Sequence, residues 1–594
     1  MVWVSGMSNT QAAQGRQYMN RYPAPISEDI WNQKYRFGAE AGIGDTWRRV
    51  AGAVASVESH DADEWQARFA GILSDYRFLP GGRILANAGT DRMATLLNCF
   101  VMGVLDDSIE GLFSALRESA VTLQQGGGIG LDFSPIRPAG SPAQRTGNVA
   151  SGPVSFMRLW DAMCETVTAH RGRSGAMMAT LRCDHPDIEL FTDAKREGGG
   201  LSHFNLSVLV TDDFVSAVDA GREWPLTFRG ETVRVVNAAA LWERMLKSSY
   251  ESGEPGVLFI DRINRENNLG YAEQIFAANP CGEVPLPPYG ACDLGSVNLT
   301  RFVSRPFTGD AQIDFEALSA TVHTAVRFLD NVLDASHYPL EQQAAQAAAS
   351  RRIGLGVTGL ADALIMLGIP YGSVQGRELA GQVLEALRDE AYRASIALAQ
   401  EKGSFPALQA PDFLARPFIR RLPETLRDGI RMNGIRNSHL LALAPTGSIS
   451  LLAGNVSTGI EPCFAGSVRR LIRRGSGNSE PVELQDYALR LWQDRNGDDL
   501  MPPAFVTAME LSPDDHLAMQ STAQGFVDNA ISKTINVPSG MPFEAFRNVY
   551  RKAFDLGLKG CTVYRQGSRG ADILTAATGA ECISGACRIE DVVD

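Results

Sequence analysis

Short apolar runs alternate with amphipathic segments along most of this chain, from about residue 95 to about residue 566. Apolar runs of strand length cover residues 99–102, 204–210 and 440–444, and apolar residues at helical spacing cover residues 108–125 and 375–401. Alternation of this kind predicts an α/β architecture with a mostly parallel sheet. No obvious linker interrupts the pattern, so we expect one large domain here.

Both ends of the chain differ from this middle part. The first 85 or so residues are predicted to be helical, because acidic residues open the segment 61–73 and its apolar residues follow helical spacing. After residue 566 the residues are small and polar, and they can bury little apolar surface. We therefore predict a helical region at 1–85, an α/β domain at 86–566 and a mobile tail at 567–594.

The composition narrows the class of protein. A net charge of −13 argues against a broad nucleic-acid-binding surface, although a helix N-terminus can still hold a small phosphorylated ligand. No stretch approaches the roughly 18 consecutive apolar residues of a membrane span, and the N-terminus shows no secretory signal. Nine cysteines in 594 residues are too sparse for a disulfide scaffold, which favours a cytoplasmic protein with reduced thiols.

Asn279, Cys281 and Glu283 occupy alternating positions in one short segment. On an extended or tightly looped backbone such side chains can face one way, so an amide, a thiol and a carboxyl group could meet at one small ligand. Six Pro and Gly residues between 280 and 290 predict a structured loop that also carries Cys292. Either cysteine alone is more often a small buried hydrophobe, but the flanking amide and carboxyl favour a catalytic role.

The remaining cysteines divide into two groups. Cys582 and Cys587 lie five residues apart in the polar tail, which suits thiol–disulfide exchange, although an incidental pair stays an alternative. A zinc site in the tail is less favoured because no other Cys or His lies near. We interpret the others as structural when taken alone: Cys99, Cys164, Cys183, Cys463 and Cys561. The eight histidines include no metal-spaced pair, so no metal site is predicted.

A candidate phosphate site follows the apolar run 440–444. It consists of Pro445, Thr446, Gly447, Ser448 and Ile449. Backbone N–H groups at a helix start, together with Thr and Ser hydroxyls, can bind an anion without a lysine. An ordinary helix N-cap is the alternative. The glycine run 126–130 is a weaker sign of close backbone approach, and no P-loop motif is present.

Taken together, these segments resemble the catalytic subunit of ribonucleotide reductase over most of residues 80–566. The resemblance is carried by residues 98–101, 126–130, 151–157, 185–188, 279–283, 354–360, 444–450 and 557–565. It implies a ten-stranded α/β barrel with the 279–283 loop threaded through its centre. It also implies an enzyme that reduces ribonucleotides, with diphosphates favoured over triphosphates, to 2′-deoxyribonucleotides.

The resemblance implies a role for each residue of the loop. Cys281 would carry a transient thiyl radical that abstracts the 3′-hydrogen of the ribose. Glu283 would accept the 3′-hydroxyl proton, while Asn279 hydrogen-bonds the substrate hydroxyls. Cys99 and Cys292 would reduce the radical intermediate and become a disulfide.

The resemblance also implies how the enzyme binds its substrate and how the disulfide is reduced again after each turnover. The 445–449 segment would hold the substrate phosphates. The tail pair Cys582 and Cys587 would re-reduce the disulfide and exchange with a thioredoxin-like reductant. The ribose side would be lined by Gly82, Asn98 and Gly128. Gly82 departs from the family, whose members often carry Ser or Thr there, so a backbone contact would have to substitute.

The radical source is the point on which sub-classes of the family differ. Thr562 and Val563 stand where the metal-dependent aerobic class has paired tyrosines, and the glycyl-radical motif is absent. The run 560–565 resembles the adenosylcobalamin-dependent class, which is expected to bind its cofactor without a protein histidine ligand. The alternatives are the same barrel served by a separate metal-containing subunit, and an inactive nucleotide-binding paralogue.

Regulation and assembly follow from the resemblance alone. Asp107, Ser108 and the loop after Ile136 would bind dNTP or ATP effectors, and Arg171 and Arg173 would relay the effector to the substrate base. In homodimeric relatives this effector site lies at the subunit interface, so we expect a homodimer. The short N-terminus shows no ATP-cone pattern.

Overall fold

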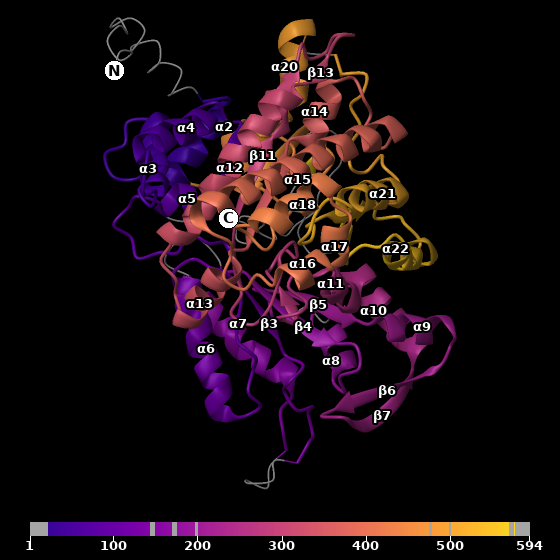
Figure 1. Ribbon diagram of the computed structural model, residues 1–594. Coiled ribbons are helices and arrows are strands. Elements are labelled where there is room, and N and C mark those ends of the chain that lie inside the picture. Colours follow the sequence, from indigo (N-terminus) through magenta and orange to yellow (C-terminus); the bar gives the residue numbers. More distant parts are fainter. Residues whose placement is uncertain are drawn as a thin grey trace, which may run out of the picture.

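The computed structural model describes residues 22–142, 149–168, 175–196, 200–474, 478–497, 500–568 and 575–576. Figure 1 shows a central sheet with helices packed around its outside. Ten strands belong to this one sheet. The observed architecture is therefore mixed α/β, as the alternation in the sequence predicted.

Five parallel strands form one half of the sheet. They are β2 (Cys99–Val101), β3 (Gly128–Asp132), β4 (Met177–Arg182), β5 (Phe204–Val210) and β8 (Gly256–Phe259). Each is hydrogen-bonded in parallel to the next in that order. Nearly all of their residues are buried, because helices cover one face of the half and a loop fills the other.

The other half meets the first half antiparallel at two places. β11 (Ala291–Asn298) pairs antiparallel with β2, and β18 (Gly560–Arg565) pairs antiparallel with β8. Within this half, β14 (Ile353–Thr358) runs parallel to β11, and β17 (Thr534–Val537) runs parallel to β18. β1 (Phe78–Pro80) pairs antiparallel with β11, along the same edge of β11 that pairs with β2.

Residues 440–444 close the ring between the two ends of this sheet. Leu441 bridges to Leu355 of β14, and Leu443 bridges to Ile531, just before β17. We expected a strand in this segment, but it makes only these single bridges. Pro445 follows directly, and Thr446 has a φ of 54°, so the chain turns before a regular ladder can form. The closed ring is a barrel.

A hairpin-like loop lies inside the barrel. Its base is made by β9 (Ala277–Ala278) and β10 (Pro285–Leu286), which pair antiparallel. Side chains of this loop share a buried cluster with β2, β11 and the closing segment, and we call residues 277–286 the finger loop. A Cβ on Gly130 would lie 2.0 Å from the Ala278 carbonyl oxygen, so only glycine lets the finger loop approach β3.

Cys292 lies in a strand and not in the loop that the Pro- and Gly-rich sequence predicted. The loop ends at Gly290, and β11 begins at Ala291. All eight residues of β11 are buried between neighbouring strands, so the ladder continues as soon as the last glycine is passed. Only Cys281 occupies the predicted structured loop.

Helices pack around the barrel. The predicted helix at 108–125 is α6 (Ile109–Gln124), whose N-terminus is capped by the Ser108 hydroxyl, and that at 375–401 is α15 (Val374–Lys402). The N-terminal part is helical as expected: α2 (Pro25–Ile30), the π-helix Trp31–Tyr35, α3 (Ile43–Ala55) and α4 (Ala62–Ser74). Figure 1 shows these first helices gathered at one corner of the molecule.

The other elements complete the layers and the surface hairpins. The helices are α5 (Gly82–Asn87), α7 (Pro153–Thr168), α8 (Ile188–Thr192), α9 (Asp212–Asp219), α10 (Ala238–Ser252), α11 (Ile260–Glu266), η2 (Leu299–Phe302), α12 (Phe315–Ala335), α13 (Glu341–Ser350), α14 (Leu360–Met366), α16 (Ala410–Leu414), α17 (Pro417–Arg420), α18 (Glu424–Asn433), α19 (Gly447–Leu452), α20 (Tyr487–Asn496), α21 (Pro513–Gln524) and α22 (Phe543–Asp555). The remaining strands are β6 (Glu223–Phe228), β7 (Glu231–Asn237), β12 (Val303–Ser304), β13 (Gln312–Ile313), β15 (Ser467–Arg474), β16 (Asn478–Gln485) and β19 (Thr575–Ala576).

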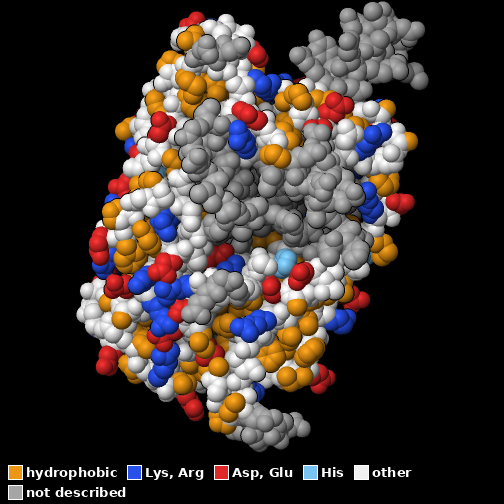
Figure 2. All heavy atoms as spheres, turned by 180° about the vertical axis from the view of Figure 1, so that it is seen from behind, with side chains coloured by type: hydrophobic (Ala, Val, Ile, Leu, Met, Phe, Trp, Pro, Cys, Tyr) orange, Lys and Arg blue, Asp and Glu red, His pale blue; other side chains and the backbone are white. Residues whose placement is uncertain are grey.

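The described surface mixes charges of both signs. On the face shown in Figure 2, acidic and basic side chains are interspersed among apolar ones. Within the part of the chain that the structure describes, no helix has the length and apolar character needed to cross a membrane.

The contact at Gly130 gives a test of the finger loop. Gly130→Ala places a methyl group against the Ala278 carbonyl, so we expect a loss of about 1–3 kcal/mol in the free energy of unfolding, measured by urea denaturation. Gly71→Ala in α4 is the matched control, since no atom lies within 4 Å of its added Cβ, and it should be neutral or stabilising. Equal stability of Gly130→Ala and the wild type would contradict the close contact.

Candidate active site

The tip of the finger loop is a tight turn closed by its own residues. Gly282 has a φ of 82°, and its N–H donates to the Asn279 carbonyl at 3.0 Å. The Val284 N–H donates to the Asn279 side-chain oxygen at 2.9 Å, while the Asn279 N–H donates to the Val284 carbonyl at 3.2 Å. The turn therefore fixes the amide of Asn279 and leaves only its Nδ2 group for other partners.

Asn279, Glu283 and Cys99 meet at one buried point. Asn279 Nδ2 donates to Glu283 Oε1 at 2.7 Å and contacts Cys99 Sγ at 3.1 Å. The Cys99 thiol in turn donates to Glu283 Oε1 at 3.9 Å. Glu283 Oε2 is buried and has no hydrogen-bond partner among the described residues. An acceptor is thus left for an incoming hydroxyl group.

The position of Cys281 is set by its neighbours on the finger loop. Asn205 of β5 donates through Nδ2 to the Pro280 carbonyl at 2.9 Å, and the Ala530 N–H donates to the Glu283 carbonyl at 2.8 Å. Cys281 itself is half-buried and lines a cavity of about 420 Å³. The sequence did not single out Asn205, although a polar residue inside the apolar run 204–210 is a usable signal.

Cys99 and Cys292 are direct neighbours across two strands. They face each other in the antiparallel register of β2 and β11, and both are buried, reduced thiols. Residues paired in this way have Cα atoms about 4.5–5.5 Å apart, which falls within the range that a disulfide spans. The two sulfurs can therefore become a disulfide without large backbone movement.

Burial favours the neutral forms of the groups of this site. It raises the pKa of the Cys281, Cys99 and Cys292 thiols well above the ordinary value, and the nearby Glu283 or Asp293 carboxyl adds to the effect. Burial also raises the pKa of Glu283 to about 7. A nucleophilic cysteine needs the thiolate, so the site is better suited to chemistry that uses an intact S–H bond.

The candidate phosphate segment lines the same cavity as Cys281. Pro445 and Gly447 face this space, and α19 begins at Gly447 as a helix start should. The hydroxyls have other partners, however: Thr446 Oγ1 contacts Thr358 Oγ1 at 2.9 Å, and Ser448 Oγ is hydrogen-bonded to the Tyr35 hydroxyl. Anion binding would therefore use the backbone N–H groups of the first turn rather than the hydroxyls we expected.

The three residues predicted on the ribose side lie near the fingertip. The Gly128 N–H donates to the Asn98 carbonyl at 2.8 Å, and a Cβ on Gly128 would lie 3.2 Å from Pro280. The side-chain oxygen of Asn98 is buried without a partner among the described residues. Gly82 opens α5, directly after Gly81, whose N–H donates to the carbonyl of Leu294 in β11.

The predicted effector residues lie away from the fingertip. The Asp107 carboxylate accepts hydrogen bonds from Arg137 Nε at 2.9 Å and from an Arg229 nitrogen at 3.0 Å. Asp107 and Arg229 also line a second cavity, of about 380 Å³. The other predicted residues are outside the described part of the chain: Arg171, Arg173, Cys582 and Cys587.

An ion pair on the cavity wall was not apparent from the sequence. Lys533 Nζ lies 2.5 Å from Glu461 Oε2 and donates to His516 Nδ1 at 3.1 Å. Glu461 also accepts the Thr534 N–H at 2.7 Å, which ties the segment between α19 and β15 to β17. The two partners are 72 residues apart in the chain, and no local motif marks them.

Comparison with known proteins decides the family. A family model described as the ribonucleotide reductase barrel domain matches residues 97–564. The chain belongs to the ribonucleotide reductase family. A second model, described as the all-alpha domain of ribonucleotide reductase, matches residues 23–93. The resemblance read from the sequence is confirmed, and so are the barrel and the helical region before it.

Several curated members of the ribonucleotide reductase family are similar along most of this chain. One from Mycobacterium tuberculosis, named vitamin B12-dependent ribonucleoside-diphosphate reductase, is 39% identical over 89% of this chain and 76% of its own length. A protein of the same name from Thermoplasma acidophilum is 37% identical over 93% of this chain and 72% of its own. The alpha subunit of a ribonucleoside-diphosphate reductase from Chlamydia pneumoniae is 26% identical over 86% of this chain and 56% of its own.

The raised pKa of Glu283 predicts a pH-dependent stability difference. A carboxyl whose folded pKa lies near 7 binds its proton more tightly in the folded state, so stability falls as the pH rises from about 4.5 to about 7. Glu283→Gln removes this loss. Between pH 5 and pH 8 we expect the free energy of unfolding of the variant to rise by about 2–3 kcal/mol relative to wild type, measured by urea denaturation.

Glu58→Gln is the matched control for that measurement. Its pKa is lowered to about 2, because hydrogen bonds from Arg327, Asn331 and Lys402 outweigh the effect of burial. Glu58 therefore does not titrate between pH 5 and pH 8 in either state, and its variant should differ from wild type by a constant amount. Parallel curves for Glu283→Gln and wild type would contradict the raised pKa.

Proposed function

We propose that this protein reduces ribonucleoside diphosphates to 2′-deoxyribonucleotides by a thiyl-radical mechanism, with adenosylcobalamin as the radical source. The observation that carries the proposal is the meeting of Asn279, Glu283 and Cys99 at the tip of the finger loop, next to Cys281, which lines the cavity of about 420 Å³. The diphosphate comes from the names of the relatives at 37–39% identity. Location in the cytoplasm stays a prediction based on the sparse cysteines.

Each residue at the tip of the finger loop would have a separate role in the reaction. Cys281, as a thiyl radical, takes the 3′-hydrogen of the ribose, and its S–H bond is thereby restored. Glu283 accepts the 3′-hydroxyl proton, which a carboxyl with a pKa of about 7 can do near neutral pH. Asn279 Nδ2 supports the carboxylate through its 2.7 Å hydrogen bond and orients the bound hydroxyl groups.

Cys99 and Cys292 would supply the reducing equivalents. The 2′-hydroxyl group would leave as water, and the two thiols would give up two electrons and two protons as they form one disulfide. Cys281 would then return its hydrogen atom to the 3′-carbon, which regenerates the thiyl radical, and Glu283 would return its proton to the 3′-oxygen. Their cross-strand register supports this role. The tail pair Cys582 and Cys587 would then reduce the disulfide by exchange and pass the oxidation to a thioredoxin-like protein.

The cavity wall is compatible with adenosylcobalamin. A volume of about 420 Å³ lies in the range of pockets that take nucleotide-sized groups such as the adenosyl arm. Polar groups that would hold it line the β17 and β18 side: Thr534, Asn536, Thr562 and Tyr564. When bound, adenosylcobalamin supplies an organic radical by homolysis of its cobalt–carbon bond.

The same barrel served by a separate metal-containing subunit is the second candidate. The similarity to the alpha subunit from Chlamydia pneumoniae favours it. Against it, Thr562 and Val563 occupy the positions where paired tyrosines would carry the radical. Val563 is fully buried and Thr562 lines the cavity. Neither side chain has an aromatic ring that could carry a radical.

Effector binding and a homodimer complete the proposal. Asp107 and Ser108 stand at the start of α6, beside the cavity of about 380 Å³ and the Arg229 guanidinium, which suits a dNTP or ATP effector. α6 also exposes Ile109 and Phe113, which are 65% and 52% accessible. Burying this apolar face against a second copy would place the effector residues at a subunit interface.

Incubation with adenosylcobalamin, a dithiol and a ribonucleoside diphosphate tests the main proposal. We expect deoxyribonucleotide by chromatography and a cob(II)alamin signal by electron paramagnetic resonance. Omitting the cofactor should remove both. Product formed only after a separate metal-containing subunit is added would favour the second candidate instead.

Cys281→Ser tests the thiyl radical. The hydroxyl holds its hydrogen far more strongly than a thiol does, so turnover should fall below detection, while nucleotide binding by equilibrium dialysis should stay close to wild type. Cys183→Ser is the matched control, because Cys183 is a buried thiol that contacts Thr211 and does not line the cavity. Turnover by Cys281→Ser above background would disprove the assignment.

A further inference from the structure

Residues 455–465 form one wall of the cavity beside Cys281, and we call them the wall loop. Its backbone is held from several sides: the Gly359 N–H donates to the Ser457 carbonyl at 2.7 Å, and the Tyr371 hydroxyl donates to the Ile460 carbonyl at 2.5 Å. The position of this wall decides the shape of the space that substrate and cofactor would share.

Asp362 anchors the same loop from the first turn of α14. Its carboxyl group accepts the Ser457 N–H at 2.5 Å and the Ala488 N–H at 2.8 Å. Its own backbone N–H donates to the Ser457 hydroxyl at 3.3 Å. Asp362 is completely buried, so these contacts join α14, the wall loop and α20 without access to water.

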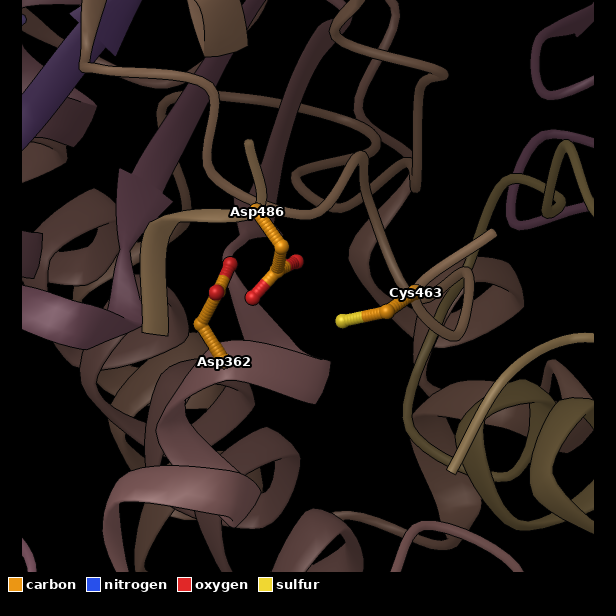
Figure 3. A group of neighbouring side chains, drawn as sticks. All are labelled: Asp362, Cys463 and Asp486. Carbon is orange, nitrogen blue, oxygen red and sulfur yellow. The ribbon is translucent and has the colours of Figure 1, made fainter. Parts of the chain in front are cut away.

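A second carboxyl group faces Asp362. Asp486 caps the N-terminus of α20 by accepting the Leu489 N–H at 3.0 Å, and it lies within 4.8 Å of both Asp362 and the Cys463 thiol. Figure 3 shows the two carboxyl groups pointing at each other and the Cys463 sulfur pointing at Asp486 from the opposite side. All three side chains are buried.

Two ionised carboxylates this close repel each other strongly, and among the described residues no cationic side chain forms an ion pair with either of them. Asp486 lies at the cavity wall, whereas Asp362 is completely buried. Burial raises the pKa of Asp362 well above its ordinary value, and the neighbouring Asp486 adds to the increase. Burial also raises the pKa of Asp486, but hydrogen bonds from the Cys463 thiol and from Asp362 oppose this increase and favour its ionised form. The shared proton therefore resides mainly on Asp362.

The anchored loop reaches the candidate phosphate segment through a short chain of hydrogen bonds. The Ser457 carbonyl accepts the Thr358 hydroxyl at 2.9 Å, and Thr358 Oγ1 lies 2.9 Å from Thr446 Oγ1. Thr446 Oγ1 also accepts the Gly459 N–H of the wall loop at 2.9 Å. Thr446 holds a left-handed conformation directly before α19, so its two partners fix where that helix begins.

We propose that Asp362 is a protonated positioning residue: by donating its proton to Asp486 it locks the wall loop, and through Thr446 it places the start of α19 for substrate phosphate. The part that concerns phosphate rests on the proposed function. The Cys463 thiol serves here as a hydrogen-bond donor, and burial raises its pKa well above the ordinary value.

Two substitutions at Asp362 separate the proton from the mere presence of a side chain. Asp362→Asn keeps a donor for Asp486 and an acceptor for the Ser457 N–H, and the Ala488 N–H, which also approaches Asp486, retains that carboxylate as its acceptor. The variant should therefore bind a ribonucleoside diphosphate within about twofold of wild type. Asp362→Leu leaves buried N–H groups without an acceptor and should weaken binding about tenfold. In turnover, Asp362→Leu should raise KM far more than it lowers kcat. Asp187→Leu removes another buried acceptor, of the Ala139 N–H, and should leave binding unchanged.

Two further measurements do not depend on the enzyme activity. Infrared difference spectra of wild type against Asp362→Asn should show the carbonyl stretch of one protonated carboxylic acid at neutral pH. Amide hydrogen exchange in residues 455–465 should accelerate in Asp362→Leu and remain slow in Asp362→Asn. If wild type binds no ribonucleotide, the proposed function is wrong. The infrared and hydrogen-exchange results still test whether Asp362 is protonated and whether it anchors the wall loop.

Three results would overturn the inference. The first is an infrared difference spectrum without a protonated carboxyl band. The second is Asp362→Leu with unchanged exchange in the wall loop, or with unchanged nucleotide affinity when wild type binds. The third is one equivalent of a divalent metal in the purified protein that disappears in Asp486→Asn, because the two carboxylates and Cys463 would then hold a cation rather than a proton.

Discussion

The contact between the Ala278 carbonyl and Gly130 determines where the rest of the active site can lie. It brings the backbone of the finger loop against β3 with no side chain between them. The fingertip is then held by backbone contacts, from Asn205 to the Pro280 carbonyl and from the Ala530 N–H to the Glu283 carbonyl. Cys281 is thereby placed by the barrel itself rather than by adaptable side-chain packing, and a reaction that removes one chosen hydrogen atom needs such accuracy.

Burial gives this site a common electrostatic character. It is the largest cause of the raised pKa values of Glu283 and of the three cysteine thiols around it. In the same low-dielectric interior, a carboxyl group is an effective acceptor only for a proton donor that lies within hydrogen-bonding distance. The Asp362–Asp486 pair follows the same physics at a distance from the reacting atoms, where a retained proton joins two elements instead of taking part in chemistry.

Local sequence was sufficient where neighbouring residues act together. The alternation of Asn279, Cys281 and Glu283 predicted that side chains of this segment meet, and Asn279 and Glu283 are in contact, while their shared ligand stays a prediction. The apolar patterns predicted α6, α15 and β5 closely. The resemblance supplied the barrel, which the family models confirm. These features depend on spacing within one segment, and that spacing is visible in the chain.

What the sequence could not give depends on register between distant segments. The pairing of Cys99 with Cys292 follows from how β2 and β11 align, and Cys292 was wrongly assigned to a loop because its strand starts one residue after a glycine. Asp362 and Asp486 are 124 residues apart, so nothing local marks them as a pair. The hydroxyls of Thr446 and Ser448 were expected to face a ligand, but Thr358 and Tyr35 occupy them.

The single bridges that close the barrel have a consequence for its assembly. A ring that encloses a loop cannot finish forming until the loop is inside, so the finger loop must be seated before Leu443 meets Ile531. The same seam carries the hydrogen bond from Ala530 to the Glu283 carbonyl, which joins residues almost 250 positions apart. Contacts of such long range form late and slowly. The contacts that place the reacting cysteine thus belong to the closure of the barrel, and completion of the fold and completion of the active site are one event.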